Sequence, residues 1–309
     1  MAQIACIGGG LVGGAWALVF ARAGHRVAIY DKDTASLQDH CLPGIVSTLS
    51  LLDSCSLLDE PIEAILSRIW TAPTLQEAVA EASYVQESVR EDLTIKRAVF
   101  ADIAKHAPID CILASSTSAL RGSDFLSDII GPERALVAHP VNPPSLIPLV
   151  ELCATQWTSP ETLEQARALL EAAQMKPITV KKEIDGYILN RLQYTLVAEA
   201  MHLVGEGYCS PEDIDRVMTD GLALRWASVG PFETAHLNAA GGFADFVAKL
   251  GDMMKTMGQA ARTDYAWGDR LAQDIHAAME KQTSVDDIPK RQAWRDSQIL
   301  AARAMQKGA

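Results

Sequence analysis

The chain has 309 residues and a formal net charge of −12, with 49% hydrophobic and 21% charged residues. These values are typical of a folded protein with room for one or two domains, and they exclude a disordered chain. The negative charge disfavours a nucleic-acid partner, because a polyanion binds basic surfaces. A small anionic substrate is still possible, since a single arginine can hold it.

Single cysteines, scattered histidines and short apolar runs exclude several further classes. The six cysteines form no C-x-x-C pair, which is typical of a reducing, cytoplasmic compartment, and Cys6 and Cys111 are expected to be buried thiols. The seven histidines show no metal-ligand spacing, so we expect no metal. With no basic leader and no apolar run near about 20 residues, we expect neither export nor membrane insertion.

From residue 2 to about 183, short apolar runs alternate with helical patterns. Strands are predicted at 3–7, 26–30, 83–87, 111–115, 134–138, 148–152 and 177–181, and helices at 11–23, 34–52, 74–81, 92–106 and 160–174. This alternation predicts an α/β fold with a Rossmann-type, doubly wound and mostly parallel sheet.

After this point the pattern becomes helical. Residues 186–206 carry apolar side chains at helical spacing, Ser210 before Pro211 predicts a helix start, and Asp220-Gly221 is interpreted as a helix stop. We therefore predict a dinucleotide-binding domain over 1–185 and an all-helical domain over 186–309. A helical half rich in Leu, Ala and Met is expected to bury its apolar face against a second copy, which favours a homodimer.

The first strand leads into a glycine-rich turn. Residues 8–13 read G-x-G-x-x-G and open the first helix. Gly8 permits the tight turn, Gly10 lets the backbone approach a pyrophosphate, and Gly13 lets helix and strand pack closely. Leu11 and Val12 belong to the helix N-terminus that faces the phosphates. The alternative is a glycine turn in an α/β protein that binds no nucleotide.

An acid follows the second strand at the position that discriminates between dinucleotides. Asp31 lies eighteen residues after Gly13. Its carboxylate can accept hydrogen bonds from the adenosine ribose and would repel a 2′-phosphate, although the neighbouring Lys32 could offset part of that repulsion. The sequence therefore predicts NAD rather than NADP as cofactor.

Polar residues that suit proton transfer follow two further strands. Ser118 ends a hydroxyl cluster after one strand, and His139 follows the next, so both are expected beyond the carboxyl ends of the sheet, where ligands bind. Glu151 lies twelve residues after His139 and can hold the imidazole in one tautomer. Asn190 is a poor helix former in a helical stretch and suggests a polar role. The alternatives are a serine cap for the next helix and a solvated helix face.

Several segments carry a resemblance to the 3-hydroxyacyl-CoA dehydrogenase superfamily, most closely to its lambda-crystallin and L-gulonate 3-dehydrogenase branch. These segments are 115–118, 138–144, 185–191, 230–233 and 291–296. The resemblance implies that His139 is the general base in oxidation, that Glu151 orients it, and that Ser118 hydrogen-bonds the reacting oxygen. It also implies that Asn190 completes the pocket and that the helical half forms a dimer.

The resemblance assigns two more residues to the cofactor. It implies that Glu91 and Lys96 touch the nicotinamide half of NAD. Spacing alone indicates only a solvated helix start at these positions.

One stretch of the chain bears on the substrate. Residues 33–67 contain six acids and no lysine or arginine, a poor partner for the phosphates of CoA, which this region helps to hold in CoA-using relatives. We therefore expect a small 3-hydroxy acid, first L-gulonate, that is oxidised to a 3-keto acid. Arg225 is the candidate partner of its carboxylate, or else a surface arginine packed on Trp226. A 3-hydroxybutyryl-CoA or carnitine dehydrogenase and a non-catalytic, crystallin-like NAD-binding protein are the alternatives.

Overall fold

The computed structural model describes residues 2–265 and 268–307. The chain divides into two compact units, one made of the residues up to Asn190 together with those from Ala293 onward, the other of Arg191–Gln292. The last helix, α14 (Ile288–Lys307), thus ends in the first unit although it follows the helical half in sequence. Leu300 explains this, because it is fully buried in the core of the first unit.

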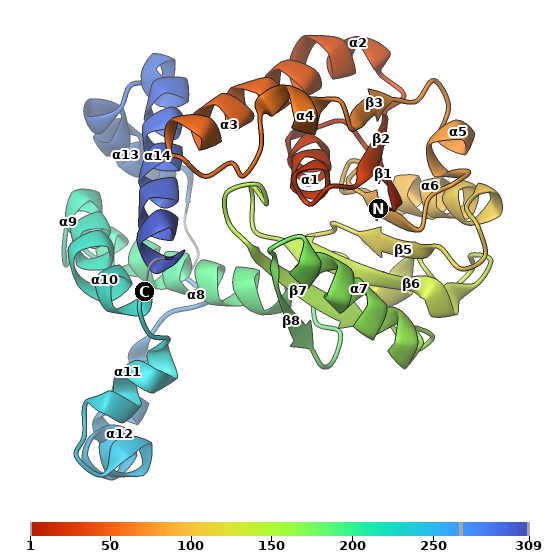
Figure 1. Ribbon diagram of the computed structural model, residues 1–309. Coiled ribbons are helices and arrows are strands. Elements are labelled where there is room, and N and C mark those ends of the chain that lie inside the picture. The colour runs from red at the N-terminus through yellow and green to blue at the C-terminus, as the bar shows by residue number, and fades with distance from the viewer. Residues whose placement is uncertain (1, 266–267, 308–309) are drawn as a thin grey trace. The chain divides into compact units, whose positions relative to one another are not determined.

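The first unit is built on one eight-stranded sheet with the strand order β3-β2-β1-β4-β5-β6-β7-β8 (Figure 1). The strands are β1 Gln3–Ile7, β2 Arg26–Tyr30, β3 Ile69–Thr71, β4 Tyr84–Glu87, β5 Ile112–Ser115, β6 Ala135–Pro140, β7 Leu149–Ala154 and β8 Lys176–Val180. Only the β6–β7 pair is antiparallel, and its register places His139 opposite Glu151. The prediction of a mostly parallel, doubly wound sheet is confirmed.

Helices cover both faces of this sheet. They are α1 Leu11–Arg22, α2 Thr34–Ser36, a π-helical turn Leu37–Cys41, α3 Leu42–Ser54, α4 Ile62–Leu66, α5 Leu75–Val79, α6 Leu93–His106, α7 Pro160–Ala172 and α14 Ile288–Lys307. One core contains Trp16, Leu49 and Leu170 from α1, α3 and α7, and the other contains Phe100 and Val79 from α6 and α5. Burial on both faces explains why the strands are continuous apolar runs.

Two short elements were not predicted from the sequence. The edge strand β3 has only three residues, all half-buried, and α4 has five. Both are too short for a periodic pattern to identify them. Cys6 and Cys111 are buried, as expected.

In the second unit, all the regular secondary structure of the described residues is helical. It contains α8 Tyr187–Gly205, which begins in the first unit, then α9 Pro211–Arg216, a π-helical turn Val217–Leu222, α10 Ala223–Trp226, α11 Pro231–Leu237, α12 Gly242–Ala260 and α13 Asp269–Gln282. Ser210 caps α9 by accepting a hydrogen bond from the Asp213 N–H at 3.1 Å. The predicted stop at Asp220-Gly221 is wrong, because the π-helical turn carries the helical path through Gly221 to Trp226.

Among the described residues, none of the helices combines the length and apolar composition needed to cross a bilayer.

Candidate active site

The glycine turn between β1 and α1 has the shape that a dinucleotide requires. A Cβ on Gly8 (φ +103°) would lie 2.6 Å from the Ser88 carbonyl oxygen, and one on Gly13 would lie 1.8 Å from the Gly8 carbonyl oxygen. A Cβ on Gly10, by contrast, would meet no atom within 4 Å. Here the backbone is open to a ligand. No side chain caps the start of α1 and no acid lies in its first turn, so its N–H groups can receive a phosphate.

The remaining predicted cofactor residues of this turn are arranged around it. Leu11 is 94% exposed, whereas Val12 packs against the core. The Asp31 carboxylate accepts hydrogen bonds from the Gly9 N–H at 2.7 Å and the Asp33 N–H at 2.9 Å, which fixes it beside the turn. A Cβ on Gly9 would lie 2.1 Å from Leu37 Cδ2, so a side chain at this position would have to displace the buried Leu37.

His139 and Glu151 form a buried pair across the antiparallel strands β6 and β7. The exposed fraction of their side chains is 3% and 1%, and Nδ1 of His139 lies 2.8 Å from Oε2 of Glu151. Because a carboxylate only accepts, Nδ1 carries the hydrogen. The pair therefore leaves Nε2 of His139 as the nitrogen that can accept a proton.

The other oxygen of Glu151 is held by the start of α8. Oε1 accepts hydrogen bonds from the backbone N–H groups of Ile188 at 2.9 Å and Leu189 at 3.0 Å. These groups belong to the positive end of a helix, so they stabilise the ionised carboxylate without a cation. This contact could not be predicted from the sequence, because β7 and α8 are far apart in the chain.

Tyr187 is a site residue that sequence reasoning missed. It is fully buried, its ring centroid lies 5.3 Å from that of His139, and its hydroxyl donates to the Leu120 carbonyl oxygen at 2.6 Å. Its φ of +51° is unusual for a bulky residue, which indicates local strain at the start of α8. Gly186, also at positive φ, precedes it and was the one available signal.

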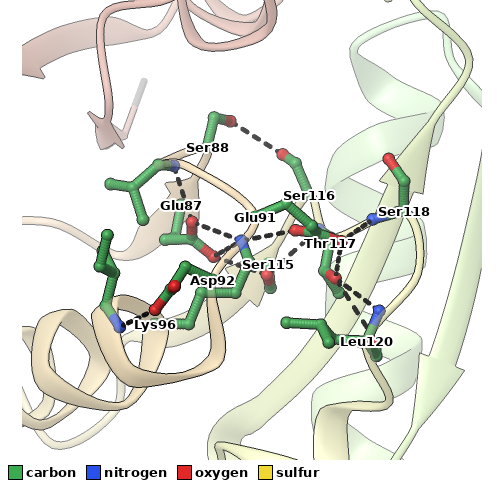
Figure 2. Close-up of polar contacts among 12 residues, drawn as sticks. Glu87, Ser88, Glu91, Asp92, Lys96, Ser115, Ser116, Thr117, Ser118 and Leu120 are labelled. Atoms are coloured by element: carbon green, nitrogen blue, oxygen red, sulfur yellow. Dashed lines mark hydrogen bonds and ion pairs between the residues drawn. The ribbon is translucent and has the colours of Figure 1, made fainter.

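The loop that carries Ser118 is fixed by hydrogen bonds from two sides. Asn190 Nδ2 donates to the Ser118 carbonyl oxygen at 3.0 Å. Oε1 of Glu91 accepts from the Thr117 hydroxyl at 2.6 Å and from the Ser118 and Ala119 N–H groups at 2.9 Å each (Figure 2). The Ser118 side chain has no hydrogen bond within residues 2–265 and 268–307, so its hydroxyl is free for a ligand.

Glu91 is an anion in this arrangement. Burial alone would raise its pKa, but the Thr117 hydroxyl, the Lys96 ammonium and the backbone N–H groups together lower it. Glu91 thus connects the helix α6 region to the Ser118 loop.

Lys96 is buried, and the alternative of a solvated helix start is wrong for it. Its side chain is 1% exposed, and Nζ lies 2.9 and 3.1 Å from the two Glu87 oxygens and 3.3 Å from Oε2 of Glu91. Burial raises the pKa of Glu87, while Lys96 and the hydrogen bonds from Ser115 and Val89 oppose that rise. The ammonium thus joins two carboxylates at the carboxyl end of β4.

Arg225 lies apart from these residues in sequence and belongs to the second unit. It is an exposed residue of the short helix α10. Its contact with a substrate carboxylate stays a prediction.

Comparison with known proteins agrees with this geometry. The family model of the 3-hydroxyacyl-CoA dehydrogenase NAD binding domain matches residues 3–184, and that of the C-terminal domain of the same enzymes matches residues 186–286. The chain belongs to the 3-hydroxyacyl-CoA dehydrogenase family. Like other members it is an NAD-dependent oxidoreductase, and the glycine turn with Asp31 fits that cofactor.

Individual relatives cover most of this family member. The lambda-crystallin homolog of Bos taurus is 38% identical over 301 residues, 96% of this chain and 93% of the relative. The L-carnitine dehydrogenase of Oceanobacillus iheyensis is 35% identical over 244 residues, 79% of this chain and 78% of the relative. A solved 5-formyl-3-hydroxy-2-methylpyridine 4-carboxylic acid 5-dehydrogenase has 25% identity and a TM-score of 0.86, covering 100% of this chain and 99% of that one.

Proposed function

We propose that this dehydrogenase oxidises the 3-hydroxyl group of a small hydroxy acid to a 3-keto acid, with L-gulonate as the first substrate to test. The observation that carries the proposal is the buried His139–Glu151 pair, in which Nδ1 is occupied and Nε2 is left for a substrate. Apolar side chains would fill the same space without the cost of desolvating an imidazole and a carboxylate, which supports a chemical role for the pair.

In the proposed mechanism, the chain supplies the proton chemistry. Nε2 of His139 takes the proton of the substrate hydroxyl, and Glu151 stabilises the imidazolium that results. The Ser118 hydroxyl hydrogen-bonds the same substrate oxygen, while Asn190 holds the Ser118 loop in place. NAD+ supplies the acceptor for the hydride that leaves the carbon as the carbonyl forms. In reduction, His139 returns the proton.

Glu91 and Lys96 are the two remaining residues assigned to the cofactor. We propose that Glu91 and Lys96 act near the nicotinamide half of NAD mainly by holding the Ser118 loop and the end of β4. Their contacts to Thr117, Ser118 and Glu87 support this arrangement.

The substrate is proposed to be a free acid rather than a CoA ester. Residues 33–67 form α2, α3 and α4 with the intervening segments and carry acids but no cation. Carnitine and the pyridine carboxylic acid that relatives are named for are both free carboxylates. We propose Arg225 as the partner of the substrate carboxylate, because its exposed guanidinium is available for a bidentate contact.

The second unit is proposed to form a homodimer, in a cytoplasmic protein whose cysteines are all unpaired. On α12, exposed apolar side chains recur at helical spacing, namely Phe243, Val247, Leu250, Met254 and Met257. We call these five residues the α12 stripe. A continuous apolar stripe of this kind favours association with an identical helix.

The experiment that tests the proposed function is initial-rate NADH formation with purified protein and NAD+. The substrates are L-gulonate, L-3-hydroxybutyrate, L-carnitine and L-3-hydroxybutyryl-CoA. The proposal expects the highest kcat/KM for a free acid. A strong preference for the thioester would overturn the substrate class, and no turnover with any of the four would favour a non-catalytic, crystallin-like role.

A further inference from the structure

A chain of hydrogen bonds, partly buried, runs from Tyr84 and Gln86 in β4 to the residues that directly follow β4 and β5. The Tyr84 hydroxyl lies 2.7 Å from Oε1 of Gln86, whose Nε2 lies 2.7 Å from the Ser116 hydroxyl. Trp16 Nε1 from α1 also donates to Ser116, at 3.1 Å. Ser116 in turn lies 2.9 Å from the Ser88 hydroxyl (Figure 2). None of the roles assigned above uses these residues.

The orientation of the Gln86 amide follows from its surroundings. Its Nε2 lies 3.3 Å from the Ala138 carbonyl oxygen, which can only accept a hydrogen bond. The reversed amide would place two acceptors against each other at that distance. Gln86 is therefore a donor toward Ser116, and its Oε1 accepts from Tyr84.

The direction of the hydrogen bond between Ser116 and Ser88 follows from the number of donors and acceptors that Ser116 offers. A serine hydroxyl has two acceptor lone pairs and one hydrogen. The lone pairs of Ser116 receive the N–H groups of Trp16 and Gln86, so its hydrogen is directed to Ser88. Ser88 thus accepts from Ser116, and its own hydrogen has no acceptor among the residues that the structure describes.

Ser88 lies where a dinucleotide approaches the sheet. It directly follows β4, at the point where the strand order reverses between β1 and β4, and ligands of doubly wound sheets bind at that point. It lies against the turn, since a Cβ on Gly8 would be 2.6 Å from the Ser88 carbonyl oxygen and one on Gly13 would be 3.6 Å from the Ser88 Cβ. Its N–H donates to the carbonyl oxygen of Ile7, the last residue of β1, at 2.7 Å. The Ser88 side chain is half-buried, so it is accessible to a ligand.

We propose that Ser88 donates a hydrogen bond to the diphosphate–ribose backbone of bound NAD, and that Ser116 is the positioning residue that fixes the direction of this donor. A preset hydroxyl loses less rotational freedom on binding than a free one. The inference rests on the use of NAD by this family and is independent of which hydroxy acid is oxidised.

Calorimetric titration of the full-length protein tests this proposal without turnover. Ser88→Ala is expected to raise the Kd for NADH about 5- to 20-fold, the range for losing one hydrogen bond to a polar or charged group. AMP, which lacks the second phosphate, should bind Ser88→Ala as it binds the wild type. A loss already seen with ADP would assign the contact to the diphosphate, and a loss first seen with ADP-ribose would assign it to the second ribose. The matched control is Ser83→Ala, which removes a hydroxyl at the opposite end of β4, where it contacts Gln3.

A double-mutant cycle tests the positioning role of Ser116. Ser116→Ala should weaken NADH binding about 2- to 5-fold, and Ser116→Thr, which keeps the hydroxyl, should restore it. Ser88→Ala combined with Ser116→Ala should bind no worse than Ser88→Ala alone, whereas a purely structural effect of Ser116 would add to it. Unchanged NADH affinity in Ser88→Ala, or an equal loss of AMP binding, would overturn the proposal.

Discussion

The two units of this dehydrogenase differ in which side chains they bury and which they expose. At the sheet end of the first unit, His139, Glu151, Glu87 and Lys96 are at most 3% exposed. In the second unit, no described residue is buried, and the α12 stripe is 36–57% exposed. Polar groups tolerate burial when each has a partner, which is the case for all four. The first unit thus satisfies its buried polar groups within one chain, while the second exposes an apolar stripe, which is the surface proposed above for the dimer contact.

The largest effect is expected at His139, the proposed general base. His139→Gln should lower kcat by about 10²- to 10⁴-fold, because it removes the proton acceptor but keeps a polar side chain beside Glu151. NADH binding should stay near the wild-type value. Steady-state rates and calorimetry measure the two quantities, with His40→Gln on the exposed π-helical turn as control. A near-normal kcat would contradict the role of His139.

Lys96 tests whether the buried charges of the first unit also support its stability. Lys96→Met would leave Glu87 as a fully buried carboxylate without its cation, which is expected to cost about 3–5 kcal/mol. Thermal and urea unfolding measure the loss, and Lys105→Met on the exposed side of the same helix is the control. The double variant Lys96→Met/Glu87→Leu should recover much of the stability that Lys96→Met loses. A single variant as stable as the control would show that Glu87 does not need this partner.

Substitutions on the α12 stripe test whether the second unit associates through this exposed apolar surface. Leu250→Asp would place a charge in the proposed dimer contact and should raise the dimer dissociation constant at least about 100-fold. Sedimentation velocity over a concentration series measures this. Thr256→Asp adds the same charge to α12 outside the stripe and should leave the association unchanged. A wild-type protein that is monomeric at all concentrations, or equal effects of the two variants, would exclude α12 as the contact.

Substitution of Arg225 tests whether the second unit contributes to substrate binding. If its guanidinium pairs with the substrate carboxylate, Arg225→Ala should raise KM about 10-fold or more, since the contact is lost in ground and transition states alike. Arg216→Ala in α9 removes another exposed arginine and serves as control. An unchanged KM for every free acid would remove Arg225 from the site.

Much of the first unit could be predicted because its signals are local. The Gly8–Gly13 turn, Asp31 and the run before His139 each combine a strand pattern with a chemical residue in the next few positions. The chemistry of the two side chains suggested the pairing of His139 with Glu151, whereas the antiparallel register that brings them opposite each other was not predicted. Predicted strand ends differ from the observed ones by two residues at most.

Contacts between segments distant in sequence could not be predicted. The hold of α8 on Glu151 depends on a helix start 37 residues away, and the contact of Asn190 with the Ser118 loop joins residues 72 positions apart. The path of the chain through Gly221 depends on a π-helical turn, which accommodates a residue that ordinarily ends a helix. In each case tertiary packing decides the structure over local propensity.

The smallest effect is expected at Glu91, which is partly exposed and holds the Ser118 loop. Glu91→Gln should lower stability at pH 7 by about 1 kcal/mol or less, because charged acceptors bind their donors more strongly than neutral ones. The pKa of Glu91 is lowered from 4.5 by folding, so its stabilisation is complete above that value and is lost as the pH falls through the folded pKa. The difference between wild type and Glu91→Gln should therefore be constant near neutral pH and vanish in acid. Urea unfolding at a series of pH values measures it, with exposed Glu81→Gln as control. A difference that persists at low pH would contradict a role for the charge of Glu91 in holding the loop.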